Sequence, residues 1–306
     1  MNRRDIVVVG ASAGGVQALK SLFQELRSGL PASIFVALHL RAGSPSFLPE
    51  ILQKCTGLRV SHASDGEEIE MGRAYIAPQD RHLLIEREHI HLSAAPKENR
   101  TRPAINPLFR SAAAAYGPRV IGVVLSGTLD DGTAGLWEIK RRGGMAIVQA
   151  PEDAEYKEMP ENAAANVDVD YLVPADQIGP LLIRLTSQNF DVSGGSVEGV
   201  MSARTRLTCP DCYGPIERFE FAGVTEYRCR VGHAYGMESM LEAHAEREER
   251  ALWSAIESLE EGADLMDETG SEKRFNANGI TQSDEAKRKL AKTIRAAIET
   301  VKLERH

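Results

Sequence analysis

A serine lies in a glycine-rich turn near the start of the chain. The pentapeptide Gly10–Gly14 reads Gly-Ala-Ser-Ala-Gly and follows the β-branched run Ile6–Val9. Apolar residues at helical spacing come next, so the motif stands between a strand and a helix, as a nucleophile elbow requires. Such a turn lifts the Ser12 hydroxyl above the sheet and places helix amides near a developing oxyanion. The alternative is a phosphate-binding glycine turn, which the same glycines also resemble.

A histidine follows the second predicted strand. The segment 33–38 is apolar and ends at His39. A dinucleotide-binding fold has an acidic residue at this place, to bind the ribose. An imidazole there instead favours a general base beside Ser12, if the two strands are neighbours. The alternative is an ordinary half-buried histidine.

Two adjacent acids follow a third apolar strand. Asp130 and Asp131 come after the run 120–125 and directly before Gly132. One of them is expected to accept the imidazole Nδ1–H, which fixes the tautomer and stabilises the imidazolium. The alternative is an N-cap for the next helix, and each acid can have one of these roles.

The elements that carry these residues alternate between strands and helices over the first two-thirds of the chain. This alternation predicts an α/β fold with a doubly wound, mostly parallel sheet in three layers. Sites in such sheets form at the carboxyl ends of strands, so Ser12, His39 and one of the two acids, Asp130 or Asp131, should meet there. The expected strands are 6–9, 33–38, 74–77, 83–86, 89–92, 120–125 and 146–149, and the expected helices are 16–26, 47–55, 107–115, 134–142, 162–166 and 177–187.

Three cysteines and a histidine cluster later in the chain. Cys209 and Cys212 form C-x2-C, and Cys229 and His233 form C-x3-H after a predicted hairpin. Two close pairs of such ligands suit a tetrahedral, structural zinc ion, which would stabilise a ribbon too small to fold by its core alone. Free thiols and a Cys209–Cys212 redox pair are the alternatives, and no thioredoxin-like βαβ unit surrounds them. Cys55 stands alone and is expected to be a buried apolar group.

Composition changes mark the expected domains. A catalytic domain is predicted at 1–190, a linker containing Ser-Gly-Gly-Ser at 191–203, a zinc-ribbon-like module at 204–236 and a helical tail at 237–306. The tail is acidic at first and carries an apolar stripe, which predicts a packing or self-association face.

The charge and hydropathy of the chain exclude other classes. The formal net charge of the 306 residues is -8, which disfavours nucleic acid as a partner, as does the acidic segment after the zinc ligands. No apolar run approaches the ~20 residues that span a bilayer, and no secretory signal is apparent. We therefore expect a cytoplasmic protein with no membrane insertion.

Several of these segments together resemble the catalytic domain of the chemotaxis protein-glutamate methylesterase family. The resemblance covers about residues 5–185 and rests on several independent motifs. They are Ile6–Gly15, Val36–Leu40, Gly72–Pro78 with Asp80 and His82, Asn99–Pro103 leading to Leu108-Phe109, Ser126–Gly132, and Pro160.

The resemblance implies a catalytic triad and no cofactor for catalysis. Ser12 would attack the ester carbonyl, His39 would carry its proton to the leaving methanol, and Asp131 would orient His39. The N–H groups of Ala13 and Thr128 would form the oxyanion hole. The sequence departs from the family at Ala13, Leu38 and Thr128-Leu129, which puts substrate preference and rate in doubt more than the reaction.

The substrates implied are methylated cytoplasmic helices of chemoreceptors, with glutamine deamidation as a further activity. Arg100 and Arg102 would contact an acidic receptor helix, and solvated surface charge is the alternative. Family members often carry a receiver domain before the catalytic domain, and here the first strand at Ile6 leaves no room for one. A methyltransferase or another signalling protein is expected to bind the C-terminal tail. Two other classes stay open: a nucleotide-binding sheet fused to a zinc ribbon, and a receptor-binding scaffold without activity.

Overall fold

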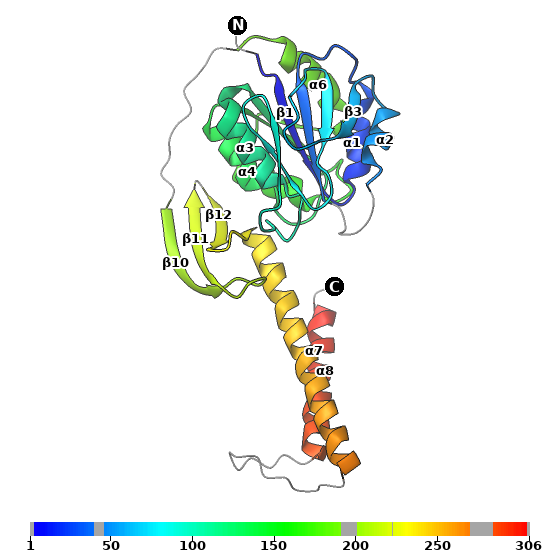
Figure 1. Ribbon diagram of the computed structural model, residues 1–306, viewed down its shortest axis with the longest axis vertical. Coiled ribbons are helices and arrows are strands. Elements are labelled where there is room, and N and C mark those ends of the chain that lie inside the picture. Colours follow the sequence, from blue (N-terminus) through cyan, green and yellow to red (C-terminus); the bar gives the residue numbers. More distant parts are fainter. Residues whose placement is uncertain (1–2, 40–45, 191–200, 222, 270–283, 305–306) are drawn as a thin grey trace. The chain divides into compact units, whose positions relative to one another are not determined.

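The chain is described by a computed structural model, which covers residues 3–39, 46–190, 201–221, 223–269 and 284–304 (Figure 1). It divides into two units, Met1–Met240 and Leu241–His306, and each is described here by itself.

A seven-stranded parallel sheet forms the centre of the first unit. The strand order is β3-β4-β2-β1-β7-β8-β9, with every neighbouring pair parallel. The chain winds outward from β1 through β2 and then returns to β7 on the other side of β1, as the doubly wound prediction requires. The strands are β1 (Ile6–Ala11), β2 (Ser33–Leu38), β3 (Arg59–His62), β4 (Arg73–Ile76), β7 (Val120–Val124), β8 (Met145–Gln149) and β9 (Tyr171–Val173).

Helices cover both faces of this sheet (Figure 1). One apolar cluster joins Val8 and Phe35 to helices α3, α4 and α5, and a second joins Val7 and Val9 to α1, α2 and α6. Alternate side chains of one strand thus enter opposite cores, and the predicted three-layer class is confirmed. The helices are α1 (Gly15–Gln24), α2 (Leu48–Gln53), α3 (Ile105–Tyr116), α4 (Thr133–Arg141), α5 (Glu158–Asn166) and α6 (Ala175–Ser187), and a 3-10 turn, η1 (Gly117–Arg119), follows α3.

Two edge strands, β3 and β9, were not expected from the sequence. β3 reads Arg-Val-Ser-His and only Val60 of its four residues is buried, while the three residues of β9 include no buried one. Continuous apolar runs reveal strands that are covered on both faces, and these two strands lack such runs. The expected hairpin forms as β5 (His82–Ile85) and β6 (Ile90–Ser93).

A small antiparallel sheet follows the catalytic sheet in the chain. Its order is β10-β11-β12-β13, where the hairpin β11–β12 was expected and β10 and β13 were not. β10 begins at Met201, within the segment expected as linker 191–203, of which 191–200 lies outside the described residues. We call residues 201–240 the Cys3His module. Its strands are β10 (Met201–Thr208), β11 (Pro215–Phe221), β12 (Val224–Cys229) and β13 (Ala234–Gly236).

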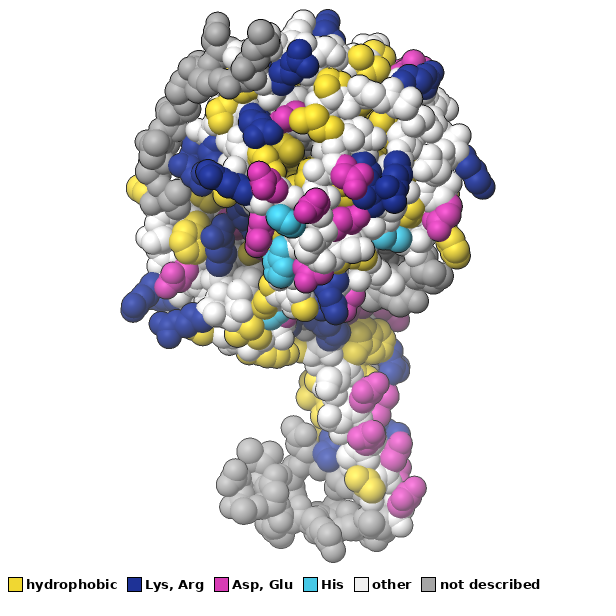
Figure 2. Space-filling model, turned by 45° about the horizontal axis from the view of Figure 1, so that its top comes forward, with side chains coloured by type: hydrophobic (Ala, Val, Ile, Leu, Met, Phe, Trp, Pro, Cys, Tyr) yellow, Lys and Arg dark blue, Asp and Glu magenta, His cyan; other side chains and the backbone are white. Residues whose placement is uncertain are grey.

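Two helices make up the rest of the chain. α7 (Met237–Thr269) starts in the first unit, and α8 (Asp284–Glu304) lies in the second. Ile256 of α7 packs against Ala291 and Ile298 of α8, which agrees with the apolar stripe noted in the sequence. No helix within the described ranges is both long and apolar enough to cross a membrane. Acidic and basic side chains are interspersed over the face shown in Figure 2.

Candidate active site

The three predicted site residues follow three adjacent strands of the sheet. Ser12 follows β1, His39 follows β2, and Asp131 lies in the loop after β7. β1 pairs with both β2 and β7, and its last residues are opposite Leu38 and Val124. The carboxyl ends of these strands therefore bring the three loops to the same edge of the sheet.

The turn at Ser12 is fixed by backbone hydrogen bonds and by Gly14. The Ser12 N–H donates to the Ser126 carbonyl at 2.9 Å, and the Gly15 N–H donates to the Ser12 carbonyl at 2.9 Å. Gly14 caps α1 with a φ of 72°, which disfavours any residue with a Cβ. A Cβ built on Gly14 would also lie 2.6 Å from the Ser126 Oγ. The glycine thus lets the chain turn sharply at the serine.

The imidazole of His39 joins the hydroxyl to the carboxylate. Its Nδ1 lies 3.1 Å from the Ser12 Oγ, and its Nε2 lies 2.8 Å from the Asp131 Oδ2. The expectation that the acid accepts from Nδ1–H was wrong, because the ring faces the acid with Nε2. With the proton on Nε2, the lone pair of Nδ1 is directed at the serine and can accept its proton.

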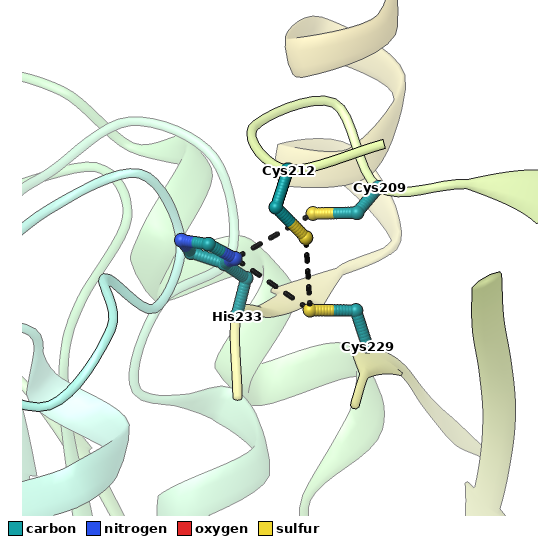
Figure 3. Close-up of side chains that lie close together, drawn as sticks. All are labelled: Cys209, Cys212, Cys229 and His233. Carbon is teal, nitrogen blue, oxygen red and sulfur yellow. Dashed lines mark hydrogen bonds between the residues drawn. The ribbon is translucent and has the colours of Figure 1, made fainter. Parts of the chain in front are cut away.

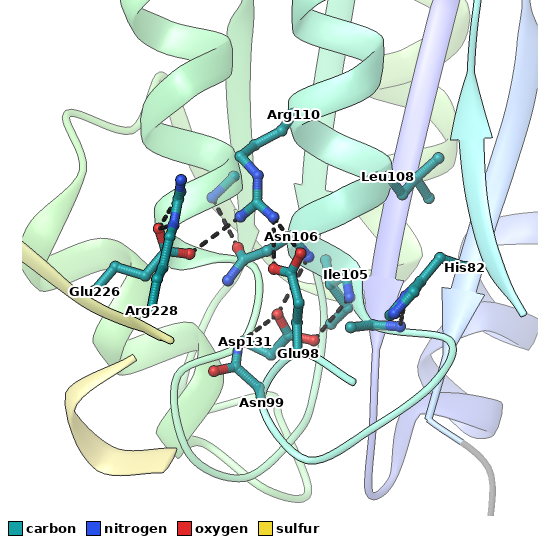
Figure 4. Close-up of polar contacts among 12 residues, drawn as sticks. His82, Glu98, Asn99, Ile105, Asn106, Leu108, Arg110, Asp131, Glu226 and Arg228 are labelled. Carbon is teal, nitrogen blue, oxygen red and sulfur yellow. Dashed lines mark hydrogen bonds and ion pairs between the residues drawn. The ribbon is translucent and has the colours of Figure 1, made fainter. Parts of the chain in front are cut away.

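Asp131 is the most enclosed of the three groups. Its side chain is 2% exposed, and five N–H groups donate to its two oxygens; Figure 4 shows Asp131 among Asn99, Ile105 and Asn106. Oδ2 accepts from His39 and from the Ile105 amide at 2.7 Å. Oδ1 accepts from Asn99 Nδ2 at 2.8 Å, Gly132 N at 2.9 Å and Asn106 N at 3.2 Å.

These donors keep the carboxylate ionised. Burial alone would raise the pKa of Asp131, but the hydrogen bond and positive charge of His39, together with the amides of Ile105 and Asn99, more than offset it and lower the pKa below its ordinary value. The acid is therefore a fixed anion that orients His39 and stabilises its protonated form.

The neighbouring acid has a different role. Asp130 accepts from the Glu238 N–H at 3.0 Å, and its Oδ1 accepts from the Ser239 hydroxyl at 2.6 Å. It therefore caps the first turn of α7 rather than helix α4, which the sequence had suggested. Burial raises the pKa of Asp130 above its ordinary value, against the hydrogen bonds from Ser239 and Glu238.

Of the two expected oxyanion donors, Ala13 directly follows the serine, and Thr128 follows Gly127, where a Cβ would lie 2.8 Å from the Ser12 Cβ. The Ala13 carbonyl accepts the Ser126 hydroxyl at 2.8 Å. Within the part of the chain that the structure describes, the N–H groups of Ala13 and Thr128 donate to no protein acceptor. Leu129, next to Thr128, has a φ of 64°, and its N–H is bound by Glu158 Oε2 at 2.8 Å.

The two arginines expected to bind substrate are already engaged. Arg102 donates from Nε and Nη2 to Asp80 Oδ1 at 2.9 and 2.7 Å, and from Nη1 to the Ala94 and Ala95 carbonyls. This set of bonds ties three segments of the loop together. Arg100 has a φ of 67° and also has a partner within the chain.

Asn99 was not singled out from the sequence as a site residue. It lies in a stretch noted for its family resemblance, which gave its position but no role. Only the fold shows that the Asn99 side chain is 4% exposed and donates a hydrogen bond to Asp131. The amides of Ile105 and Asn106 are likewise invisible in a sequence, because any residue supplies a backbone N–H.

The four expected metal ligands come together in the Cys3His module (Figure 3). One ligand atom from each of Cys209, Cys212, Cys229 and His233 lies within 4.8 Å of the others. The His233 Nδ1 is 3.7 Å from Cys209 Sγ and 3.5 Å from Cys229 Sγ, and Cys212 Sγ is 3.6 Å from Cys229 Sγ. Three sulfurs and one nitrogen at such separations can hold a metal ion.

A hydroxyl, an imidazole and a buried carboxylate in series at the carboxyl edge of a parallel sheet define a serine hydrolase of the α/β class. The family comparison agrees with this class: residues 7–182 match the model of the CheB methylesterase family, and the chain belongs to that family.

Individual relatives cover the same part of the chain. A Leptospira interrogans protein, provisionally named a protein-glutamate methylesterase/protein-glutamine glutaminase, is 37% identical over 188 residues, which are 61% of this chain and 97% of that protein. Protein-glutamate methylesterase/protein-glutamine glutaminase 2 of Methanosarcina acetivorans is 38% identical over 60% of this chain, which matches about half (53%) of that longer protein.

A solved structure shows the same fold. The crystal structure of the Thermotoga maritima CheB methylesterase catalytic domain is 34% identical, with a TM-score of 0.58, and the match covers 59% of this chain and 98% of that one. The Cys3His module and the C-terminal helices lie beyond the family match, which ends at residue 182.

Proposed function

We propose that this protein hydrolyses methyl esters of glutamate side chains on chemoreceptors, releasing glutamate and methanol in chemotaxis adaptation. The observation that carries the proposal is the hydrogen-bonded series Ser12–His39–Asp131 in a member of the CheB methylesterase family. We place the reaction in the cytoplasm, with the methylated cytoplasmic helices of chemoreceptors as substrate.

The proposed reaction has two halves. The Ser12 Oγ attacks the ester carbonyl carbon while His39 Nδ1 takes the hydroxyl proton. The N–H groups of Ala13 and Thr128 stabilise the oxyanion. The intermediate then expels methanol, which takes the proton from His39 and leaves an acyl-enzyme.

Water completes the cycle. It loses a proton to His39 and attacks the acyl carbon, and the Ser12 oxygen leaves with that proton, so that the receptor's glutamate carboxylate and the starting enzyme result. A glutamine amide at the same position would release ammonia in place of methanol. Deamidation therefore needs no additional group, and we propose it as a second activity. Arg102 binds Asp80 and two carbonyl groups, and we assign it to shaping the loop. Arg100 also has a partner within the chain, and we propose it as the residue that contacts an acidic receptor helix.

The test is methanol release from a methylated receptor fragment. Ser12→Ala should reduce turnover to background while the melting temperature stays close to that of the unmodified chain. Ser28→Ala is the matched control, because Ser28 is exposed and precedes β2, at the opposite edge of the sheet. Turnover by Ser12→Ala at the control rate would refute the proposal.

We also propose that Cys209, Cys212, Cys229 and His233 hold a structural zinc ion, which is supported by their clustering and soft-ligand chemistry. Metal analysis of the reduced protein should give about one zinc per chain, and Cys212→Ser should lower it. Cys55→Ser is the control, since Cys55 lies outside the cluster and its Sγ donates to the Ile51 carbonyl. Absence of metal from the reduced, unmodified chain would refute the site.

For partners, we propose that the C-terminal helices bind a methyltransferase or another signalling protein. Leu241 and Leu265 of α7 are about three-fifths exposed (59% and 61%), which leaves apolar surface for a partner. Titration of the full chain with purified methyltransferase should show binding that Leu265→Glu weakens and that the exposed-site control Glu268→Gln does not. If no binding is detected at any concentration, the methyltransferase is not a partner of this chain.

A further inference from the structure

Strand β13 joins the Cys3His module to the catalytic loop. It starts one residue after the ligand His233, and on one side it pairs with β12. On its other side, the Asn99 N–H donates to the Ala234 carbonyl at 2.8 Å, and Glu98 forms a parallel bridge with Ala234. The loop that precedes helix α3 therefore pairs with the free edge of β13 in the module's sheet.

The Asn99 side chain continues this connection to the triad. Its Oδ1 accepts the Gly236 N–H at 2.8 Å, and its Nδ2 donates to Asp131 Oδ1 at 2.8 Å. Because Gly236 offers a donor and Asp131 an acceptor, the amide has only one orientation that satisfies both. A single buried side chain therefore links the last residue of β13 to the acid that orients His39.

A second connection runs through the neighbouring acid. Asp130 binds the first turn of α7 through Glu238 and Ser239, as described above. It also fills the space beside Gly236, where a Cβ would lie 2.1 Å from the Asp130 Oδ2. The module thus contacts both acids of the Asp130-Asp131 pair.

A third connection is a buried set of charges. Arg110 of α3 donates from Nη1 to Glu226 of β12 at 3.1 Å and from Nη2 to Glu98 at 2.6 Å (Figure 4). Glu226 is 1% exposed and Arg110 is 26% exposed, so this ion pair is partly shielded from solvent. The guanidinium holds two carboxylates from different parts of the fold and so fixes the loop that carries Asn99.

At the other end, β13 depends on the ligand cluster. Tyr235 is the middle residue of β13. Its hydroxyl lies 3.4 Å from Cys209 Sγ and donates to Asp211 Oδ2 at 2.6 Å. Cys229 and His233, which flank the turn before β13, are themselves two of the four ligands. A metal that draws the ligands together would therefore also set the position of β13.

We infer that the Cys3His module positions the catalytic Asp131 through Asn99, so that metal in the cluster supports turnover without touching substrate. Asn99 is a positioning residue: it acts through Asp131 and His39. The inference rests on the proposed esterase function and on the proposed metal. It adds that the module regulates the rate of the reaction.

The first experiment is a double-mutant cycle on the full chain. Esterase kcat and KM are measured for the unmodified chain, Cys212→Ser, Asn99→Ala and the double variant. Each single change should lower kcat by about 10- to 100-fold with KM nearly unchanged, since it loosens the hydrogen bonds of a buried charge. The double variant should be little worse than either single one, because both act through the same bond. Losses that multiply would overturn the inference.

A second variant separates positioning from metal loss or unfolding. Gly236→Ala keeps all four ligands but would press its Cβ into Asp130, so it should retain metal and lose kcat as Asn99→Ala does. Arg206→Ala is the control, because Arg206 is exposed on β10, which is the strand of the module's sheet farthest from β13. Full activity of Gly236→Ala with metal bound would contradict the inference.

A spectroscopic readout does not depend on turnover. In the chain labelled with 15N-histidine, the proton that His39 Nε2 shares with Asp131 should give a downfield resonance. Metal removal by a chelator and Asn99→Ala should shift or broaden it alike, whereas Arg206→Ala should not. If Ser12 proves dispensable for turnover, the esterase proposal fails, and this resonance still decides whether the module acts on the triad. An unchanged resonance after metal removal would refute the inference.

Discussion

Replacing Asp131 by asparagine changes one atom of the triad and leaves its volume unchanged. Five N–H groups converge on the two oxygens of Asp131, and an amide can accept on one side only. If Nδ2 takes the place of Oδ1, it faces the donors Asn99, Asn106 and Gly132. If it takes the place of Oδ2, it faces Ile105 N and the His39 Nε2.

The second orientation determines the size of the catalytic effect. The amide then donates to His39 Nε2, which moves the ring proton to Nδ1 and removes the lone pair that Ser12 needs. Loss of the correct tautomer in a Ser-His-Asp triad costs about 10,000-fold in kcat, or about 5 kcal/mol of activation free energy. The unmatched donors should also lower the free energy of unfolding by about 1–3 kcal/mol.

The assay is methanol release under saturating methylated substrate, together with a thermal melt. Asp168→Asn is the matched control, since Asp168 is exposed and remote from the three loops. We expect the control to match the unmodified chain in both measurements. A kcat for Asp131→Asn within tenfold of the control would show that Asp131 does not set the tautomer of His39, and the reasoning would be refuted.

Three further predictions concern the scaffold of the site. Gly14→Ala should reduce both kcat and the melting temperature, because a left-handed φ of 72° and a Cβ 2.6 Å from the Ser126 Oγ must be accommodated beside the nucleophile. Arg110→Met should lower the free energy of unfolding in denaturant titration by about 1–3 kcal/mol, because Glu98 loses its cation while Glu226 keeps Arg228. The lowered pKa of Asp131 contributes stability that is present above the ordinary carboxyl pKa of about 3.9 and is lost as pH falls below it, so acid unfolding should be shallower in Asp131→Asn. An equally steep acid transition in that variant would contradict the last prediction.

The sheet and the triad were predictable because each leaves a local signal. Strands that are buried on both faces require continuous apolar runs, such as those that contain Val7, Val9 and Ile34. The catalytic residues follow directly after such runs. Parallel strands then bring Ser12 and His39 to the same edge without any further information. Edge strands such as β9 escaped this reasoning, because one side of an edge strand has no neighbouring strand, and the three residues of β9 are half-buried or exposed.

The orientation of the imidazole was not predictable from residue types. Histidine offers two nitrogens, and the choice depends on which side of the ring faces the loop after β7. The same holds for Asn99, whose role depends on a strand more than a hundred positions later in the chain. Contacts between distant segments leave no periodic pattern, so a single sequence cannot reveal them.

The adjacent acids Asp130 and Asp131 show how one loop can serve both chemistry and assembly. Asp131 has a lowered pKa because His39 and amides donate to it, while burial raises the pKa of Asp130, which binds the start of α7. A loop that turns between the two residues aims one carboxylate at the triad and the other at the module. Asp130 thus fixes the start of α7 while Asn99 carries the coupling to Asp131, so substitution of Asn99 should remove most of the metal dependence of kcat.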